Sequence, residues 1–152
     1  MVGIETNICN IGIGAGEWDI YLSYKLRKGS LTSVDRLEIC CRQLEQRLPC
    51  EGNPHDVKVV CSDVMTLKLE KQFDIVTMVG STVIESGMGI TLVEKAMSFV
   101  KEGGAMYYQS LDKKEDCNEV LQAAYRYGMK LAAFLEDNAY GFIGHYYKFE
   151  KI

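Results

Sequence analysis

The sequence predicts an α/β fold in which helices cover both faces of a doubly wound parallel sheet. Short apolar, strand-like segments alternate along the whole chain with segments whose apolar residues follow helical spacing. Residues 73–80 are apolar almost throughout, as in a central strand covered on both faces. Glycine clusters at 12–16 and 103–104 stand where a strand meets a helix and where a helix meets a strand. Right-handed connections between parallel strands then place helices on both faces.

Each expected element has its own local signal. Basic residues crowd the end of the first helix before Gly29, which suits a helix C-terminus, and Pro49 is expected to close the second helix. The last strand follows a short Asp-Asn-Ala-Tyr turn, so we expect it to pair antiparallel with its neighbour. Strands are expected at 8–13, 30–35, 57–63, 73–80, 105–110, 130–136 and 141–151, and helices at 16–28, 37–48, 91–101 and 116–127.

Length and composition indicate one folded domain over residues 1–152, since 47% of the residues are hydrophobic and 25% are charged. A net charge of −4 argues against a phosphate-neutralising surface, so nucleic acid is not the expected partner. The chain has no apolar run long enough to cross a membrane and no basic-then-apolar leader at its start. We therefore expect a cytoplasmic protein with no membrane partner.

The six cysteines form no Cys-x-x-Cys pair, and most lie in apolar runs, where a thiol behaves as a small hydrophobic group. We expect them to be reduced. The nearest approach to a metal pattern is Cys50 with His55, and two ligands do not make a four-ligand zinc site. The sequence therefore predicts no metal.

The strongest motif runs from Asn10 to Glu17, Asn-Ile-Gly-Ile-Gly-Ala-Gly-Glu. Its glycines let the backbone turn sharply and approach a ligand closely, and the next helix offers its N-terminal amides. A dinucleotide-binding fingerprint would need glycine where Glu17 stands, so the spacing favours a nucleoside ligand over a pyrophosphate. A tight strand-to-helix turn without a ligand is the other interpretation.

Two aspartates follow at the ends of the next strands. Asp35 could accept hydrogen bonds from both hydroxyls of a ribose, or it could cap the helix that follows. Asp63 could accept from an exocyclic adenine amine, or it could cap its own turn. In open α/β sheets, ligands bind at the carboxyl ends of the strands, where these residues are expected to meet.

Taken in order, five motifs resemble those of the class I S-adenosylmethionine-dependent methyltransferases. They are the glycine loop 12–16, Asp35-Arg36, Ser62-Asp63, residues 73–76 and residues 100–104. The resemblance implies S-adenosylmethionine as cofactor and a seven-stranded sheet of order 3-2-1-4-5-7-6 with strand 7 antiparallel. Similar small-molecule enzymes commonly carry an N-terminal helical cap. The first expected strand begins at residue 8, so we expect no such cap here and an open site.

The resemblance further implies a role for individual residues. Asp35 would hold the ribose, Arg36 would flank the adenine, and Asp63 would bind the adenine amine. The cofactor-binding set implied in this way is Asn10, Gly12, Ile13, Gly14, Gly16, Asp35, Arg36, Asp63, Val64, Val79 and Gly80. The family pattern has an acidic residue at the position of Asn10, so this chain lacks one negative charge there.

Candidate catalytic groups are few. Methyl transfer mainly requires alignment, with a base only where the nucleophile loses a proton. Glu85, in the loop after residues 73–80, is the candidate base, or a carboxylate that stabilises a helix start. His145 could accept a proton from a substrate hydroxyl, or it could pack on neighbouring aromatic residues.

The leading hypothesis is a methyltransferase that acts on a small molecule or a protein side chain. Two alternatives stay open. One is a weak or inactive cofactor-binding module that serves a partner, and the other is an aminopropyl-type transferase. A macromolecular substrate, a second subunit in a homo-oligomer or heteromer, or the 81–90 loop would complete the open site.

Overall fold

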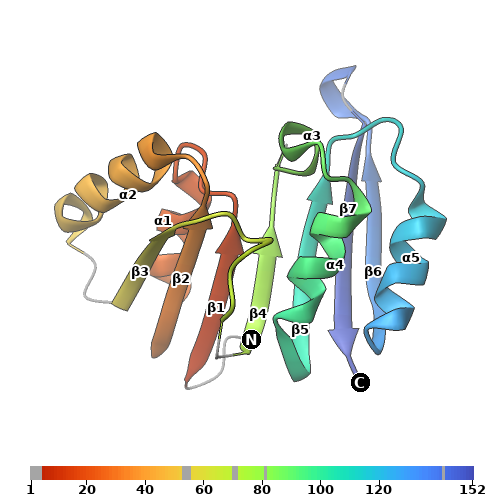
Figure 1. The fold of residues 1–152 in the computed structure, drawn as a ribbon, viewed down its shortest axis with the longest axis horizontal. Helices are drawn as coiled ribbons and strands as arrows, with labels where there is room; N and C mark the ends of the chain where they lie inside the picture. Colours follow the sequence, from red (N-terminus) through yellow and green to blue (C-terminus); the bar gives the residue numbers. More distant parts are fainter. Residues whose placement is uncertain (1–4, 53–55, 70–71, 81, 142) are drawn as a thin grey trace.

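One seven-stranded mixed sheet organises the computed structural model, which describes residues 5–52, 56–69, 72–80, 82–141 and 143–152. The strands are β1 (Thr6–Ile11), β2 (Gly29–Asp35), β3 (Asp56–Cys61), β4 (Phe73–Met78), β5 (Val100–Ser110), β6 (Met129–Asp137) and β7 (Gly144–Lys151). Their order is β3-β2-β1-β4-β5-β7-β6, and only β7 runs antiparallel to its neighbours (Figure 1). The predicted fold class and the strand order implied by the resemblance are both confirmed.

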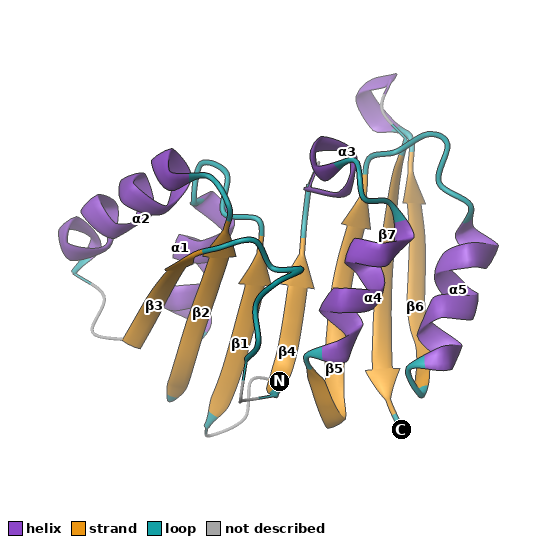
Figure 2. Ribbon diagram, in the orientation of Figure 1, coloured by secondary structure: helices purple, strands orange, loops and turns teal. Residues whose placement is uncertain are grey.

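Helices cover the two faces of this sheet. They are α1 (Glu17–Lys25), α2 (Glu38–Glu51), α3 (Thr82–Ser86), α4 (Ile90–Ser98) and α5 (Cys117–Arg126), and a 3-10 turn, η1 (Ala139–Gly141), precedes β7. Figure 2 shows α4 and α5 in front of β5, β7 and β6, and α1 behind the other half of the sheet. None of the helices in the described ranges is long and apolar enough to cross a bilayer.

The core follows from the alternation of side chains along the strands. On one face, Ile8 of β1 and Leu31 of β2 pack against Leu22 and Leu26 of α1. On the other face, a larger cluster joins β1, β4, β5 and β7 to α4 and α5. The carboxyl ends of β1, β2, β3 and β4 therefore meet at one edge of a rigid, packed sheet.

Several element boundaries differ from the prediction by one to three residues, and α3 lies in the segment expected to be a loop. Two differences have a clear physical reason. The second helix continues two residues beyond Pro49 and ends before Gly52, which has a left-handed φ of 64°. Pro49 gives up one hydrogen bond to the carbonyl four residues earlier, which the exposed last turn tolerates, and glycine provides the actual stop. The fifth strand starts at Val100, inside the segment expected to be helical. A register shift opposite Phe73–Ile75 accommodates the residues before Ala105, so the glycines bend a strand instead of ending a helix.

The cysteines are free thiols, as the sequence predicts. Burial raises the pKa of the Cys9 thiol and the Cys41 thiol to about 12, so both stay protonated at neutral pH. Cys50 is exposed on α2, and His55 lies outside the described residues.

Candidate functional site

A cavity of about 310 Å³ opens at the carboxyl ends of β1, β2 and β4. This volume is at the lower end of the range for small-molecule sites, roughly 300–1,000 Å³. The cavity draws its walls from the β1–α1 turn, the ends of β2 and β3, and α3 with the segment before α4. The sequence-predicted residues that line it are Gly12, Ile13, Gly14, Asp35, Arg36, Asp63, Val64, Val79, Gly80 and Glu85.

Glycines keep the floor of this cavity free of side chains. Gly14 and Gly80 both have positive φ, and a Cβ added to either would meet no atom within 4 Å. Gly12 is different, because its Cβ would lie 2.3 Å from Oγ1 of Thr82 in α3. The glycine loop therefore faces open space at Gly14 and packs closely under α3 at Gly12.

The Asp35 carboxylate joins the end of β2 to the glycine loop. Its Oδ2 accepts from the backbone amides of Ile13 at 2.8 Å and Gly14 at 3.2 Å. Its Oδ1 accepts from the amide of Leu37 at 2.9 Å, which is the capping role considered for it. A carboxylate has about four lone-pair positions. These three bonds leave room for one further donor, and the longer Gly14 bond is the easiest to exchange for a second.

Two other polar residues that line the cavity, Arg36 and Asp63, are also held in place. The Nη2 atom of Arg36 donates to the Glu85 carbonyl of α3 at 3.2 Å, so this side chain reaches across from β2 to α3. The Oδ1 atom of Asp63 accepts from the amide of Met65 at 2.9 Å and thereby caps its own turn. Asp63 also lines the cavity, so its capping bond and a ligand contact are compatible.

Residues 8–104 match the sequence profile of a family described as a methyltransferase domain. The chain belongs to this family. The match covers well over half of the chain and includes β1 to the start of β5, which together carry the cavity. No curated protein matches the sequence.

Solved structures of other proteins have the same fold as this methyltransferase domain. The magnesium protoporphyrin IX methyltransferase of Synechocystis, solved with bound S-adenosylmethionine, superposes with a TM-score of 0.78 at 12% identity, over 97% of this chain and 71% of that chain. The N-methyltransferase NodS of Bradyrhizobium japonicum gives 0.76 at 14% identity, over 96% and 85%. An S-adenosylmethionine-dependent methyltransferase of Clostridium acetobutylicum gives 0.76 at 12% identity, over 99% and 85%. At these identities the likeness is one of fold.

Two sequence-predicted residues of the methyltransferase domain do not reach the cavity wall. Asn10 is fully buried beneath the loop, and Gly16 begins α1 where a Cβ would lie 3.2 Å from Leu44. The side-chain nitrogen Nδ2 of Asn10 donates to the Gly12 carbonyl at 3.2 Å, and its Oδ1 accepts from the Thr77 hydroxyl at 2.8 Å. Asn10 thus ties the loop to β4 from below.

Sequence reasoning missed two polar residues near the site, and the first is Asp19. It is fully buried in the first turn of α1, and its Oδ1 accepts from the Asn10 amide at 2.8 Å. Its Oδ2 and the Ser33 hydroxyl are both buried without a close hydrogen bond among the described residues. Burial raises the pKa of Asp19 to about 6 from 3.8, although Ser33 lies near enough to lower this pKa. The negative charge that Asn10 lacks is therefore present nine residues later, in direct contact with Asn10.

A sequence signal for Asp19 existed. Asp19 precedes Leu22 by three residues and Ser23 by four, which places it on the buried stripe of the helix. Gln109 was also missed. Its side-chain oxygen accepts from the Gly80 amide at 3.1 Å, and its nitrogen donates to the Tyr146 hydroxyl at 2.9 Å. These two hydrogen bonds connect the cavity, at Gly80, to Tyr146 of β7.

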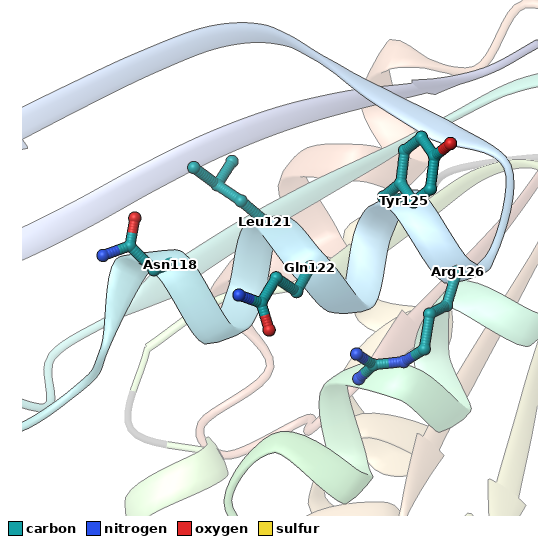
Figure 3. A pocket seen from close by; sticks show the side chains of 5 residues that line it. All are labelled: Asn118, Leu121, Gln122, Tyr125 and Arg126. Carbon is teal, nitrogen blue, oxygen red and sulfur yellow. The ribbon is translucent and has the colours of Figure 1, made fainter.

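A separate hollow lies on the outer face of α5, where Asn118, Leu121, Gln122, Tyr125 and Arg126 line it (Figure 3). These residues all come from one helix, and Tyr125 is 83% exposed. Arg126 pairs with Glu94 of α4, so its charge is already used. One helix face cannot enclose a small molecule, so this hollow is not the functional site.

Proposed function

We propose that this methyltransferase domain binds S-adenosylmethionine in the 310 Å³ cavity and transfers its methyl group to a small molecule or a protein side chain. The observation that carries the proposal is the Asp35 carboxylate, held against the glycine loop on the cavity wall. A ribose needs an acceptor beside a surface without side chains, and Gly14 leaves that surface open.

The residues around Asp35 suit the rest of an adenosyl group. Arg36 would flank the adenine, Asp63 would accept from its amine, and Val64 would pack on the ring. Gly12, Ile13 and Gly14 would line the methionine and ribose portions, with Val79 and Gly80 on the opposite wall. Asn10 and Gly16 would act indirectly, by shaping the loop and the start of α1.

Bound in this cavity, the cofactor would supply a methyl group on a cationic sulfur, and that sulfur would keep the carbon–sulfur electron pair when the methyl group passes to the acceptor. The task of the protein is alignment. Glu85 lines the cavity from α3 and would take the proton that a hydroxyl or amine acceptor loses. Asp19 places a negative charge beneath the loop, where it would favour a cationic ligand.

The first test is calorimetric titration with S-adenosylmethionine and with S-adenosylhomocysteine. Asp35→Asn replaces one accepting oxygen with an NH₂ group, which then faces either the backbone N–H donors or the ribose hydroxyls. We therefore expect the affinity for both ligands to fall about tenfold or more. Glu38→Gln is the control, because it removes an exposed carboxylate of α2 that pairs with Arg42. A wild-type chain that binds neither ligand would refute the proposed cofactor, and full affinity in Asp35→Asn would refute its placement.

The role of Glu85 is tested by release of S-adenosylhomocysteine against a panel of acceptors. We expect Glu85→Gln to keep cofactor affinity and to lose about 100-fold in turnover with a hydroxyl or amine acceptor. Equal turnover would remove Glu85 as the base. Cofactor binding without turnover would favour the partner-module alternative, and methylthioadenosine as product would favour aminopropyl transfer.

The open side of the site stays a prediction. Tyr107 of β5 and Tyr146 of β7 are 40% and 36% exposed, and Tyr146 is connected to Gly80 of the cavity through the side chain of Gln109. A protein substrate or a second subunit would cover such a surface, and the mass in solution with and without the acceptor measures this. The cytoplasmic location expected from the sequence is likewise a prediction.

A further inference from the structure

Three potential metal ligands meet at the edge of the sheet beyond the cavity. Glu115 lies in the connection from β5 to α5, Cys117 is the first residue of α5, and His145 is the second residue of β7. One ligand atom from each lies within 4.8 Å of the other two. None of the three lines the cofactor cavity. From this geometry we infer that Glu115, Cys117 and His145 form a zinc site.

The orientation of His145 favours this inference. Its Nε2 lies 3.1 Å from Oε2 of Glu136, the residue that faces His145 across the β6–β7 pair. A carboxylate accepts a hydrogen bond, so in the neutral ring the proton is assigned to Nε2. The lone pair of Nδ1 then points at the other two ligands. A carboxylate on the distal ring nitrogen is the usual partner of a metal-binding histidine.

The distances from Nδ1 of His145 to the other two donor atoms are close to those in a tetrahedral zinc site. With zinc–ligand bonds of about 2.0–2.3 Å, such an ion needs about 3.5 Å between sulfur and nitrogen and about 3.3 Å between nitrogen and oxygen. Nδ1 of His145 lies 3.8 Å from Sγ of Cys117 and 3.5 Å from Oε1 of Glu115. Shifts of a few tenths of an ångström would bring Nδ1 to the ideal distance from each of the other two atoms, which lie within 4.8 Å of one another.

The charge balance of the cluster points to a cation. The Glu115 side chain is 9% exposed, and no lysine or arginine pairs with it in the described ranges. Zinc binding releases the Cys117 thiol proton to solvent, so the carboxylate and the thiolate together neutralise the divalent ion. A mixed sulfur, nitrogen and oxygen donor set suits zinc better than magnesium or calcium.

Two buried tyrosines support the ligands from behind. The Tyr147 hydroxyl lies 2.8 Å from Oε1 of Glu115 and 3.1 Å from Sγ of Cys117. The Tyr108 hydroxyl donates to Oε2 of Glu115 at 2.5 Å. Such outer hydrogen bonds hold ligands in position. The protein supplies three ligands, so a water molecule would take the fourth position.

The test uses the reduced full chain after chelator treatment, titrated with Zn²⁺ by calorimetry and with Co²⁺ by absorbance. We expect one equivalent of each metal, a cobalt–thiolate charge-transfer band and a higher melting temperature with zinc. Cys117→Ser should remove the band and weaken zinc binding more than about 100-fold. Glu136→Gln should keep the band and weaken binding about tenfold. Cys50→Ser, which removes an exposed thiol on α2, should match the wild type.

Three results would overturn the zinc site. They are no saturable zinc binding by the wild type, Co²⁺ binding without a thiolate band, and binding that survives both Cys117→Ser and His145→Ala. The wild-type cobalt spectrum reports on Cys117 directly, so the test stands even where a variant fails to fold. The first result would leave His145 with a structural role, as the residue between the carboxylates of Glu115 and Glu136.

Discussion

Gly12→Ala is expected to destabilise the methyltransferase domain by about 3 kcal/mol in urea unfolding. The new Cβ would lie 2.3 Å from Oγ1 and 2.9 Å from Cγ2 of Thr82, and alanine would have to adopt a φ of +89°. Either the loop or α3 has to move, and both carry cavity residues. We therefore expect affinity for S-adenosylmethionine to fall at least about tenfold.

Two further variants separate crowding from backbone strain. Gly52→Ala places alanine at a φ of +64° with no atom within 4 Å, so it should cost about 1 kcal/mol and leave cofactor affinity unchanged. Gly12→Ala combined with Thr82→Ala removes the two closest atoms and should recover about half of the lost stability. Equal losses in Gly12→Ala and Gly52→Ala would contradict the close packing of Thr82 over the loop.

Asp19→Asn is expected to stabilise the fold at pH 8 by about 3 kcal/mol and to have little effect at pH 4. Asparagine can still accept from the Asn10 side-chain amide, and its own amide nitrogen can donate to the nearby Ser33 hydroxyl. The folded-state pKa of Asp19 is raised from 3.8 to about 6. At pH values between these two pKa values, the folded chain still holds a proton that the unfolded chain has released. The wild type loses stability as the pH rises through 6.

The measurement is the difference in unfolding free energy between the Asp19→Asn variant and the wild type at unit steps from pH 4 to pH 8. It should rise from near zero and level off above about pH 7. Glu45→Gln is the matched control, because it removes an exposed carboxylate from the middle of α2. The difference for that variant should stay flat with pH. A flat difference for Asp19→Asn would mean that the carboxylate ionises normally in the folded chain.

The same variant also probes the cofactor site. At pH 8 the Asp19 carboxylate is ionised and contacts Asn10 beneath the glycine loop. S-adenosylmethionine carries a positive charge on sulfur that S-adenosylhomocysteine lacks. We therefore expect Asp19→Asn to lower affinity for the first ligand more than for the second. A carboxylate that reduces stability and favours the ligand would explain an acidic residue in a buried position.

The sequence was enough to predict the order of the elements, the glycine loop and the position of Asp35. Each depends on neighbours within a few positions, through apolar periodicity or through a backbone turn that requires glycine. The boundaries at Pro49 and Val100 were predicted wrongly. The C-terminal turn of α2 tolerates proline, and the pairing of β4 with β5 decides where β5 begins.

The sequence by itself determined an α/β chain with a glycine loop suited to a nucleoside ligand, and the hydrogen-bond acceptor Asp35 at the end of the next strand. The tertiary structure alone decided which distant side chains touch. The β5–β7 register places Ser110 opposite His145, and this brings the residues after Ser110 beside the start of β7. The packing of α1 on β1 places Asp19 against Asn10. Local pattern carries no information on such contacts, because each depends on the registers and packing of several elements at once.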